Sequence, residues 1–252
     1  MSLRKLGRLL VCGTLLLGVG LLHTRGEEKK ESTAVKPVPR DKNWEKRHEG
    51  FVGEAKKGGI ELLFLGDSIT DEWRREPDKE KMRGGKKVFD TVFAPLKAVN
   101  FGIGGDRTQH VLWRLQNGEL DGIKPKVVML MIGTNNSNGN DNTAEEIADG
   151  IKAILAEIQK KSPETKVLLL GSFPRGPKPN VQREKLKAVN DIIAKLDDGG
   201  KKVKYLDIGG KFLAADGELT KEIMPDFLHL SEKGYQIWAD AVKEPIQMLL
   251  GK

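Results

Sequence analysis

Five short apolar runs set the strongest constraint on how this chain can fold. They cover residues 60–65, 98–101, 127–132, 167–170 and 203–206. Each run has the length of a buried strand, and helical patterns fill the segments between the runs. This alternation predicts a parallel sheet with helices on both faces, joined by right-handed crossovers. We therefore expect an α/β fold, a three-layer α/β/α sandwich built on a five-stranded parallel sheet.

The helical pattern is clearest between the third and fourth runs. There the apolar residues repeat at the spacing of one helix face: Ile147, Ile151, Ile154, Leu155 and Ile158. Thr143 and Glu146 form a capping box at the start of this helix. Further helices are expected over residues 43–57, 186–196 and 235–250. Pro245 should kink the last of these helices, because proline removes one helical hydrogen bond.

The first 26 residues have the layout of an export signal. Arg4, Lys5 and Arg8 precede an apolar segment of 14 residues, 9–22. That segment is shorter than the roughly 20 residues of a membrane span, but no small-residue cleavage site follows it. Residues 1–26 are therefore either a signal peptide or an uncleaved N-terminal membrane anchor. In both cases we expect an exported protein, whether periplasmic, secreted or anchored.

The remainder of the chain is predicted to form a short linker and one domain. Residues 27–42 are polar and contain prolines, so we expect a linker without a core of its own. Residues 43–252 are long enough for a single domain with a sizeable core. The one cysteine, Cys12, lies in the leader, so the domain has neither a disulfide nor a thiolate metal site.

The formal net charge of +7 suits a nucleic-acid-binding protein, but the distribution of charge does not. Residues 1–26 contain four basic and no acidic residues, which leaves +3 on the remainder. Basic and acidic residues alternate through that remainder, without a basic face that carries spaced aromatics. One basic cluster stands out and is expected to be a solvated loop and helix start: Lys79, Lys81, Arg83, Lys86 and Lys87. We therefore expect no nucleic-acid partner.

Glycines and polar residues follow the first three apolar runs. They are Gly66-Asp67-Ser68, then Gly102 to Asp106, then Gly133 to Asn136. Parallel strands bring their carboxyl ends to one edge of the sheet, where open α/β sheets bind their ligands. Glycine also lets the backbone approach a ligand closely. The sequence therefore predicts that these three segments line one crevice.

Ser68 stands where a nucleophile would be placed, although a serine after a strand is often a helix N-cap or a turn residue. Among the four histidines, His229 has the clearest carboxylate partner, Asp226, three residues before it. Asp226 could accept the His229 Nδ1–H and leave Nε2 free to take a serine proton. The alternative is that Asp226 starts a helix and His229 is structural.

An acyl transfer also creates an oxyanion, which needs hydrogen-bond donors. The backbone N–H groups of Ser68 and Gly105 and the side-chain amide of Asn135 would supply three. Taken singly, Asn135 could be a turn or cap residue, and the glycines could form an ordinary tight turn. Taken together, the nucleophile, base, acid and donors predict a serine hydrolase.

Four sequence blocks carry a resemblance to a known family. Residues 66–68, 104–106 and 133–135, followed by Asp226-x-x-His229, are similar in content and order to the four blocks of the SGNH (GDSL-type) hydrolases. Residues 100–136, 173–180 and 226–230 resemble one branch more closely, the catalytic subunits of the intracellular platelet-activating-factor acetylhydrolases. The resemblance extends over residues 61–250, which is nearly the whole predicted domain.

The resemblance implies a role for each candidate residue. Ser68 would be the nucleophile, His229 the general base and Asp226 its orienting partner. Ser68, Gly105 and Asn135 would form the oxyanion hole. The family also implies a flavodoxin-like sheet, no metal and no organic cofactor, and this branch implies a homodimer. Two features depart from the branch: residues 69–73 look more like bacterial esterases, and the export leader does not suit a cytosolic enzyme.

The predicted function is that of a serine esterase acting on a small-molecule ester. We expect small acyl groups, acetyl above all, on an exposed substrate such as a decorated carbohydrate. The alternative substrate is a lipid, as for a platelet-activating-factor acetylhydrolase or a lysophospholipase. A different class is a non-catalytic module that binds glycans or lipids. A nucleotide- or phosphate-binding protein is excluded, because residues 102–105 lack the glycine spacing of either phosphate-binding motif.

Overall fold

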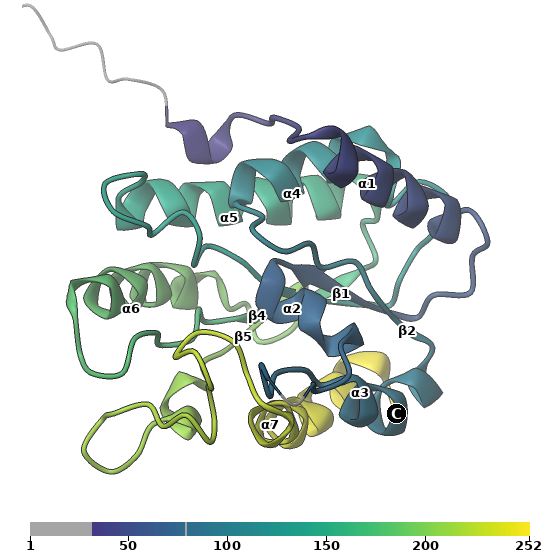
Figure 1. Ribbon diagram of the computed structural model, residues 1–252. Coiled ribbons are helices and arrows are strands. Elements are labelled where there is room, and N and C mark those ends of the chain that lie inside the picture. The colour runs from purple at the N-terminus through teal and green to yellow at the C-terminus, as the bar shows by residue number, and fades with distance from the viewer. Residues whose placement is uncertain (1–31, 79) are drawn as a thin grey trace, which may run out of the picture. The chain divides into compact units, whose positions relative to one another are not determined.

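The computed structural model describes residues 32–78 and 80–252, which form the packed unit drawn in colour in Figure 1. The predicted signal peptide or membrane anchor, residues 1–26, lies outside the described residues, as does the start of the predicted linker. Among the described helices, none has both the length and the apolar character that a membrane span requires.

A parallel sheet of five strands lies at the centre of the described residues. The strands are β1 (Leu62–Gly66), β2 (Ala98–Asn100), β3 (Val127–Met131), β4 (Lys166–Leu170) and β5 (Val203–Leu206). Their order across the sheet is β2-β1-β3-β4-β5, and each pair of neighbours is parallel. Every residue of β1 and β3 is buried, which explains why these runs are apolar throughout.

Helices cover both faces of the sheet, so the predicted α/β/α sandwich is confirmed (Figure 1). One face is covered by α1 (Lys42–Ala55), α4 (Thr108–Arg114), α5 (Ala144–Lys161) and α6 (Val181–Ile193). The other face is covered by α3 (Lys86–Val92) and α7 (Glu232–Leu250). The short α2 (Ser68–Asp71) follows β1 directly. Single turns complete the fold: η1 (Thr33–Val35), η2 (Glu72–Arg74), η3 (Ala94–Leu96), η4 (Leu115–Glu119), η5 (Ala194–Leu196) and η6 (Gly209–Phe212).

Side chains of each strand alternate between two separate cores. In β1, Leu63 packs into the core beneath α1, α4, α5 and α6, whereas Phe64 packs into the core beneath α3 and α7. Two fully buried tryptophans, Trp73 and Trp238, occupy the second core with their ring centroids 5.0 Å apart. Burial of such large rings supplies much of the hydrophobic stabilisation on that face.

The two longest helices begin and continue for identifiable reasons. The capping box of α5 forms as predicted, since the Thr143 hydroxyl accepts the Glu146 N–H at 3.2 Å and the Glu146 carboxylate accepts the Thr143 N–H at 2.9 Å. The helix α7 contains Pro245 in its interior and continues to Leu250. Val242 and Ile246, on either side of the proline, are fully buried, so core packing keeps the helix continuous.

Residues 32–41 differ from the prediction of a linker, because they pack against the domain. Ala34 is fully buried, and its carbonyl oxygen accepts the Thr108 hydroxyl at 2.8 Å. The Asn142 amide donates to the Thr33 hydroxyl at 3.0 Å. Gly150 in α5 leaves room for this segment, since a Cβ there would lie 2.8 Å from the Ala34 carbonyl oxygen. These contacts involve residues far apart in the chain, so the polar composition of the segment did not reveal them.

We predict that Ala34→Arg destabilises the protein by about 1–3 kcal/mol, because a long charged side chain cannot fit at a fully buried site without moving its neighbours. Urea unfolding of the purified protein measures this effect. Val38→Arg is the matched control, since Val38 lies in the same segment with 43% of its surface exposed. Equal stability of the two variants would show that residues 32–41 do not pack on the domain.

Candidate active site

The turn between β1 and α2 places Ser68 at the carboxyl edge of the sheet. Gly66 ends the strand at a point without room for a side chain, since a Cβ would collide with the Thr70 hydroxyl and the Met131 carbonyl. Asp67 is the N-cap of α2 and accepts the Ile69 N–H at 3.0 Å. Ser68 is therefore not the capping residue, and its hydroxyl is free for another partner.

The structure brings together the three side chains that the sequence predicts as nucleophile, base and orienting acid. Ser68 Oγ lies 2.9 Å from His229 Nε2, although 161 residues separate them in the chain. On the other side of the ring, His229 Nδ1 lies 2.8 Å from Asp226 Oδ2. This order of contacts lets Asp226 accept the Nδ1–H while Nε2 accepts the hydroxyl of Ser68.

Asp226 is fixed by more than the imidazole. Its Oδ1 accepts the backbone N–H groups of Leu228 at 3.1 Å and His229 at 2.7 Å. Partial burial acts to raise the pKa of Asp226, but hydrogen bonds from His229 and Arg83 outweigh it and hold that pKa well below its usual range. Asp226 therefore stays ionised at neutral pH, as an acceptor for Nδ1–H requires.

The other described histidines are engaged elsewhere. His48 Nδ1 lies 3.2 Å from Glu119 Oε2, and its Nε2 lies 3.0 Å from the Asn117 carbonyl oxygen. His110 Nδ1 accepts the backbone N–H of Arg107 at 3.0 Å, and burial lowers the pKa of His110 to about 4. Neither ring contacts Ser68, so His229 is the histidine that the geometry offers as a base.

The predicted oxyanion donors lie on the loop after β2 and the loop after β3. Gly105 has a φ of +80°, and a Cβ on the preceding Gly104 would lie 3.8 Å from the Cβ of Ser68. The Asn135 amide donates one hydrogen bond to the Asp106 carbonyl at 2.8 Å, which leaves its second hydrogen available. Within the described residues, the N–H groups of Ser68 and Gly105 donate to no protein acceptor. Each of the three predicted groups therefore keeps one N–H that no described acceptor uses.

Asp71 joins the helix of Ser68 to the loop after β2, residues 102–106, which we call the glycine loop. The sequence position of Asp71 did not suggest this role. Its Oδ2 accepts the Gly104 N–H at 3.0 Å and the guanidinium of Arg47, from α1, at 2.7 Å. Arg74 also donates to Asp71, at 2.6 Å. The carboxylate thus connects the turn that carries Ser68 to the loop that carries Gly105.

Asp106, which closes the glycine loop, is completely buried and carries several charged contacts. Its Oδ1 accepts Trp44 Nε1 at 2.7 Å and Arg40 at 3.1 Å, and its Oδ2 accepts the buried Arg114 at 3.0 Å. A buried carboxylate needs such partners, because an unpaired charge inside a protein is costly. Arg40 reaches this site from the segment predicted to be a linker.

The family is decided by a sequence match that spans residues 64–237, to the model of the GDSL-like lipase/acylhydrolase family. The chain belongs to this family. Platelet-activating factor acetylhydrolase IB subunit alpha2 from Rattus norvegicus is 41% identical over 217 residues, which covers 86% of this chain and 89% of the rat protein. Subunit alpha1 from Homo sapiens is 40% identical over 212 residues, covering 83% and 86%.

Solved structures show the same fold at lower sequence identity. Est24, a carbohydrate acetylesterase from Sinorhizobium meliloti, superposes with a TM-score of 0.58 at 21% identity, over 75% of this chain and 99% of that one. Family membership and the acetylhydrolase relatives make the protein a carboxylic ester hydrolase.

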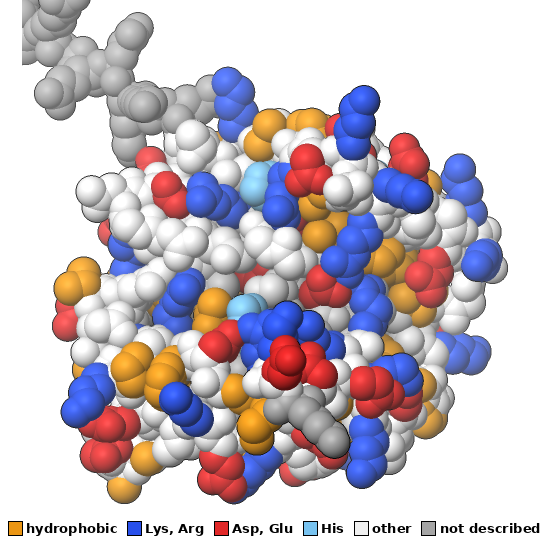
Figure 2. Space-filling view, in the orientation of Figure 1, with side chains coloured by type: hydrophobic (Ala, Val, Ile, Leu, Met, Phe, Trp, Pro, Cys, Tyr) orange, Lys and Arg blue, Asp and Glu red, His pale blue; other side chains and the backbone are white. Residues whose placement is uncertain are grey.

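The surroundings predicted for Arg83, a residue beside His229 and Asp226, were wrong. Arg83 was expected in a solvated basic cluster, but its guanidinium donates to Asp226 Oδ2 and lies 2.8 Å from His229 Nδ1. No local pattern marks such a contact, because 143 residues separate Arg83 from Asp226. On the face in Figure 2, Lys and Arg side chains stand beside Asp and Glu side chains.

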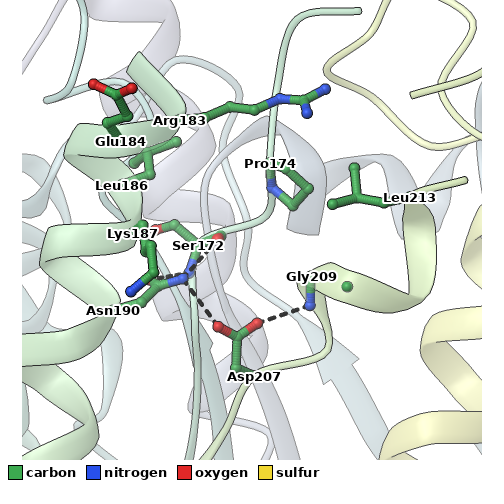
Figure 3. Close-up of a pocket in the computed structure, with 11 residues that line it drawn as sticks. Ser172, Pro174, Arg183, Glu184, Leu186, Lys187, Asn190, Asp207, Gly209 and Leu213 are labelled. Carbon is green, nitrogen blue, oxygen red and sulfur yellow. Dashed lines mark hydrogen bonds between the residues drawn. The ribbon is translucent and has the colours of Figure 1, made fainter. Parts of the chain in front are cut away.

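A surface cavity of about 400 Å³ lies between α6 and η6 of the hydrolase (Figure 3). Asp207, which lines this cavity, accepts the Gly209 N–H at 2.8 Å and the Asn190 amide at 3.3 Å. None of the predicted site residues lines this cavity. Within the described part of the chain, no group of three or more metal-ligating side chains is present.

Asp67, next to the nucleophile, is fully buried, and this burial raises its pKa to about 7. A raised carboxyl pKa means that the folded state holds the proton more tightly than the unfolded state does. The contribution of this carboxyl group to stability is then greatest below pH ~4 and is lost as the pH rises to about 7. The fall can reach roughly 4 kcal/mol, because each pKa unit corresponds to about 1.4 kcal/mol.

We therefore predict that Asp67→Asn, which can still cap α2, gains stability relative to the parent protein as the pH rises from about 4 to about 7. Urea unfolding of both proteins across this pH range measures the difference. A difference that stays constant with pH would show that Asp67 ionises normally in the folded protein.

Proposed function

We propose that the protein is a serine esterase in which Ser68 is the nucleophile, His229 the general base and Asp226 the residue that orients the base. The observation that carries the proposal is the continuous chain of contacts from Ser68 Oγ through the His229 ring to Asp226 Oδ2, at 2.9 and 2.8 Å. A serine hydroxyl is a weak nucleophile until a base accepts its proton, and this chain of contacts provides such a base.

The reaction proceeds through an acyl-enzyme. Ser68 Oγ attacks the ester carbonyl as its proton passes to His229 Nε2, and the resulting oxyanion binds the N–H groups of Ser68 and Gly105 and the amide of Asn135. Collapse of this intermediate expels the alcohol, which takes the proton from Nε2. Water then attacks the acyl-enzyme with His229 as base, and the acid is released.

We propose acetyl as the preferred acyl group and a soluble acetylated carbohydrate as the acyl acceptor. The acetyl group is supported by the rat and human relatives, which are acetylhydrolases. A soluble substrate is supported by the surface, since hydrophobic side chains lie among charged ones on the face in Figure 2 instead of forming one broad apolar face. It also accords with export, which we propose from residues 1–26.

A second candidate substrate is an acetylated phospholipid. It is favoured by the 41% identity to a platelet-activating factor acetylhydrolase subunit, which extends over 86% of this chain. The same chemistry serves both substrates, because the acetyl ester is the reacting group in each. By analogy with that branch of the family, we also propose that the protein is a homodimer.

We predict that Ser68→Ala lowers kcat/KM for p-nitrophenyl acetate by about 10⁴- to 10⁶-fold while the melting temperature stays close to that of the parent. The same variant should lose labelling by a fluorophosphonate probe, which reacts only with an activated serine. Ser172→Ala is the matched control, since Ser172 lies near the end of β4 and its hydroxyl donates to the Ile132 carbonyl at 3.4 Å. Undiminished turnover by Ser68→Ala would rule out the assignment.

We predict that kcat/KM for p-nitrophenyl esters is highest for acetate and declines through butyrate and octanoate. Release of acetate from acetylated xylooligosaccharides and from an acetylated ether phospholipid then distinguishes the two acceptors, and we expect the faster release from the carbohydrate. A maximum at octanoate would contradict the acetyl preference, and faster release from the phospholipid would assign the second candidate.

A further inference from the structure

Arg83 lies against the pair formed by His229 and Asp226. Its Nη1 donates to Asp226 Oδ2 and lies 2.8 Å from His229 Nδ1, while Nδ1 lies 2.8 Å from the same carboxylate oxygen. An arginine nitrogen cannot accept a hydrogen bond. When Nδ1 carries its proton, the two nitrogens therefore do not bond to each other but converge on one oxygen of Asp226.

Arg83 is itself held in place by Glu72, which lies next to the helix of Ser68. Its Nη2 lies 2.9 Å from Glu72 Oε1, and Glu72 directly follows the helix α2 that begins at Ser68. The Arg83 side chain is only 16% exposed. The next residue, Gly84, donates its backbone N–H to the Leu230 carbonyl at 3.1 Å. Residues 83 and 84 thus connect the helix of Ser68 to the loop of His229.

Asp226 needs such a contact, because its surroundings leave one oxygen weakly constrained. Its side chain is 40% exposed, and the following Phe227 has a left-handed backbone with a φ of +58°. The two backbone N–H groups of the loop bind Oδ1. Oδ2 is left to His229 and Arg83. A charge-assisted hydrogen bond from a guanidinium is short and strong, so it can hold this oxygen in place.

We propose that Arg83 is a positioning residue that holds Asp226 Oδ2 where it accepts the Nδ1–H of His229. With the proton kept on Nδ1, the Nε2 lone pair faces Ser68 Oγ. In the other tautomer, Nε2 would carry the proton and could not take one from the serine. This inference rests on the proposed function of Ser68 and His229, and it adds to that function a residue from the loop before α3.

The neighbouring Arg75 provides a matched control. Its Nη1 donates to the same carboxylate oxygen, Glu72 Oε1, at 2.8 Å. Within the described residues, Arg75 makes no hydrogen bond or ion pair with Asp226 or His229. If the two arginines act only by holding Glu72, replacing either one should lower kcat equally. If Arg83 positions Asp226 and His229, only its replacement should lower kcat.

The test uses the full chain with Arg83→Met, Arg83→Lys and Arg75→Met, assayed with p-nitrophenyl acetate. We expect Arg83→Met to lower kcat by about 10- to 100-fold, the scale of one lost charge-assisted hydrogen bond, with KM changed by less than about threefold. Arg83→Lys should recover part of kcat, and Arg75→Met should keep the parent value. A parent-like kcat in Arg83→Met, or an equal loss in Arg75→Met, would overturn the inference.

A double-mutant cycle locates the effect. If Arg83 acts through Asp226, then Arg83→Met should lower kcat little further in an Asp226→Ala background. The same fold loss in both backgrounds would contradict the inference. Ser68→Ala distinguishes failure of this inference from failure of the proposed function. If Ser68→Ala is inactive and Arg83→Met is fully active, only the role of Arg83 is rejected. If Ser68→Ala is active, the esterase assignment itself is rejected.

Discussion

The candidate site depends on how closely α2 approaches the ends of the strands beside it. At Gly66 a side chain would collide with the Met131 carbonyl of β3, and at Gly102 a Cβ would lie 2.5 Å from the backbone nitrogen of Asp71. Only glycine permits this approach, since any other residue would push the helix away from the sheet. This close contact brings Ser68 next to the glycine loop, where a Cβ on Gly104 would lie 3.8 Å from the Cβ of Ser68.

Charged groups, more than apolar ones, then fix the loops around Ser68. Asp71 holds the Gly104 N–H, Asp106 is buried against Arg114, and Arg83 holds Asp226. The pair of Asp106 and Arg114 is fully buried, and breaking such a pair by removing one partner is far more costly than breaking a surface pair. Such contacts favour one arrangement of the loops, so the positions proposed for the oxyanion donors and the base are fixed by the fold.

The sequence predicted most of the fold, and it predicted that Ser68, His229 and Asp226 meet, because the signals for both are local. A buried strand such as residues 127–131 is apolar throughout, and the spacing of Asp226 and His229 places both in one turn. The roles of Arg83 and Arg40 had no such signal. Each is a charged residue in a polar segment, and its partner lies more than 60 residues away, at Asp226 or Asp106. Ion pairs over such separations follow from the tertiary fold and leave no periodic pattern.

The packed segment before α1 also sets where the catalytic unit begins. Thr33 and Ala34 contact the body of the domain, and Arg40 bonds both the Gly104 carbonyl, at 2.7 Å, and Asp106. A chain shortened to residue 43 would retain every strand and every residue of the serine–histidine–aspartate set. It would nevertheless lack one of the cations that surround Asp106, so a fragment suited to enzymology should retain Thr33, Ala34 and Arg40.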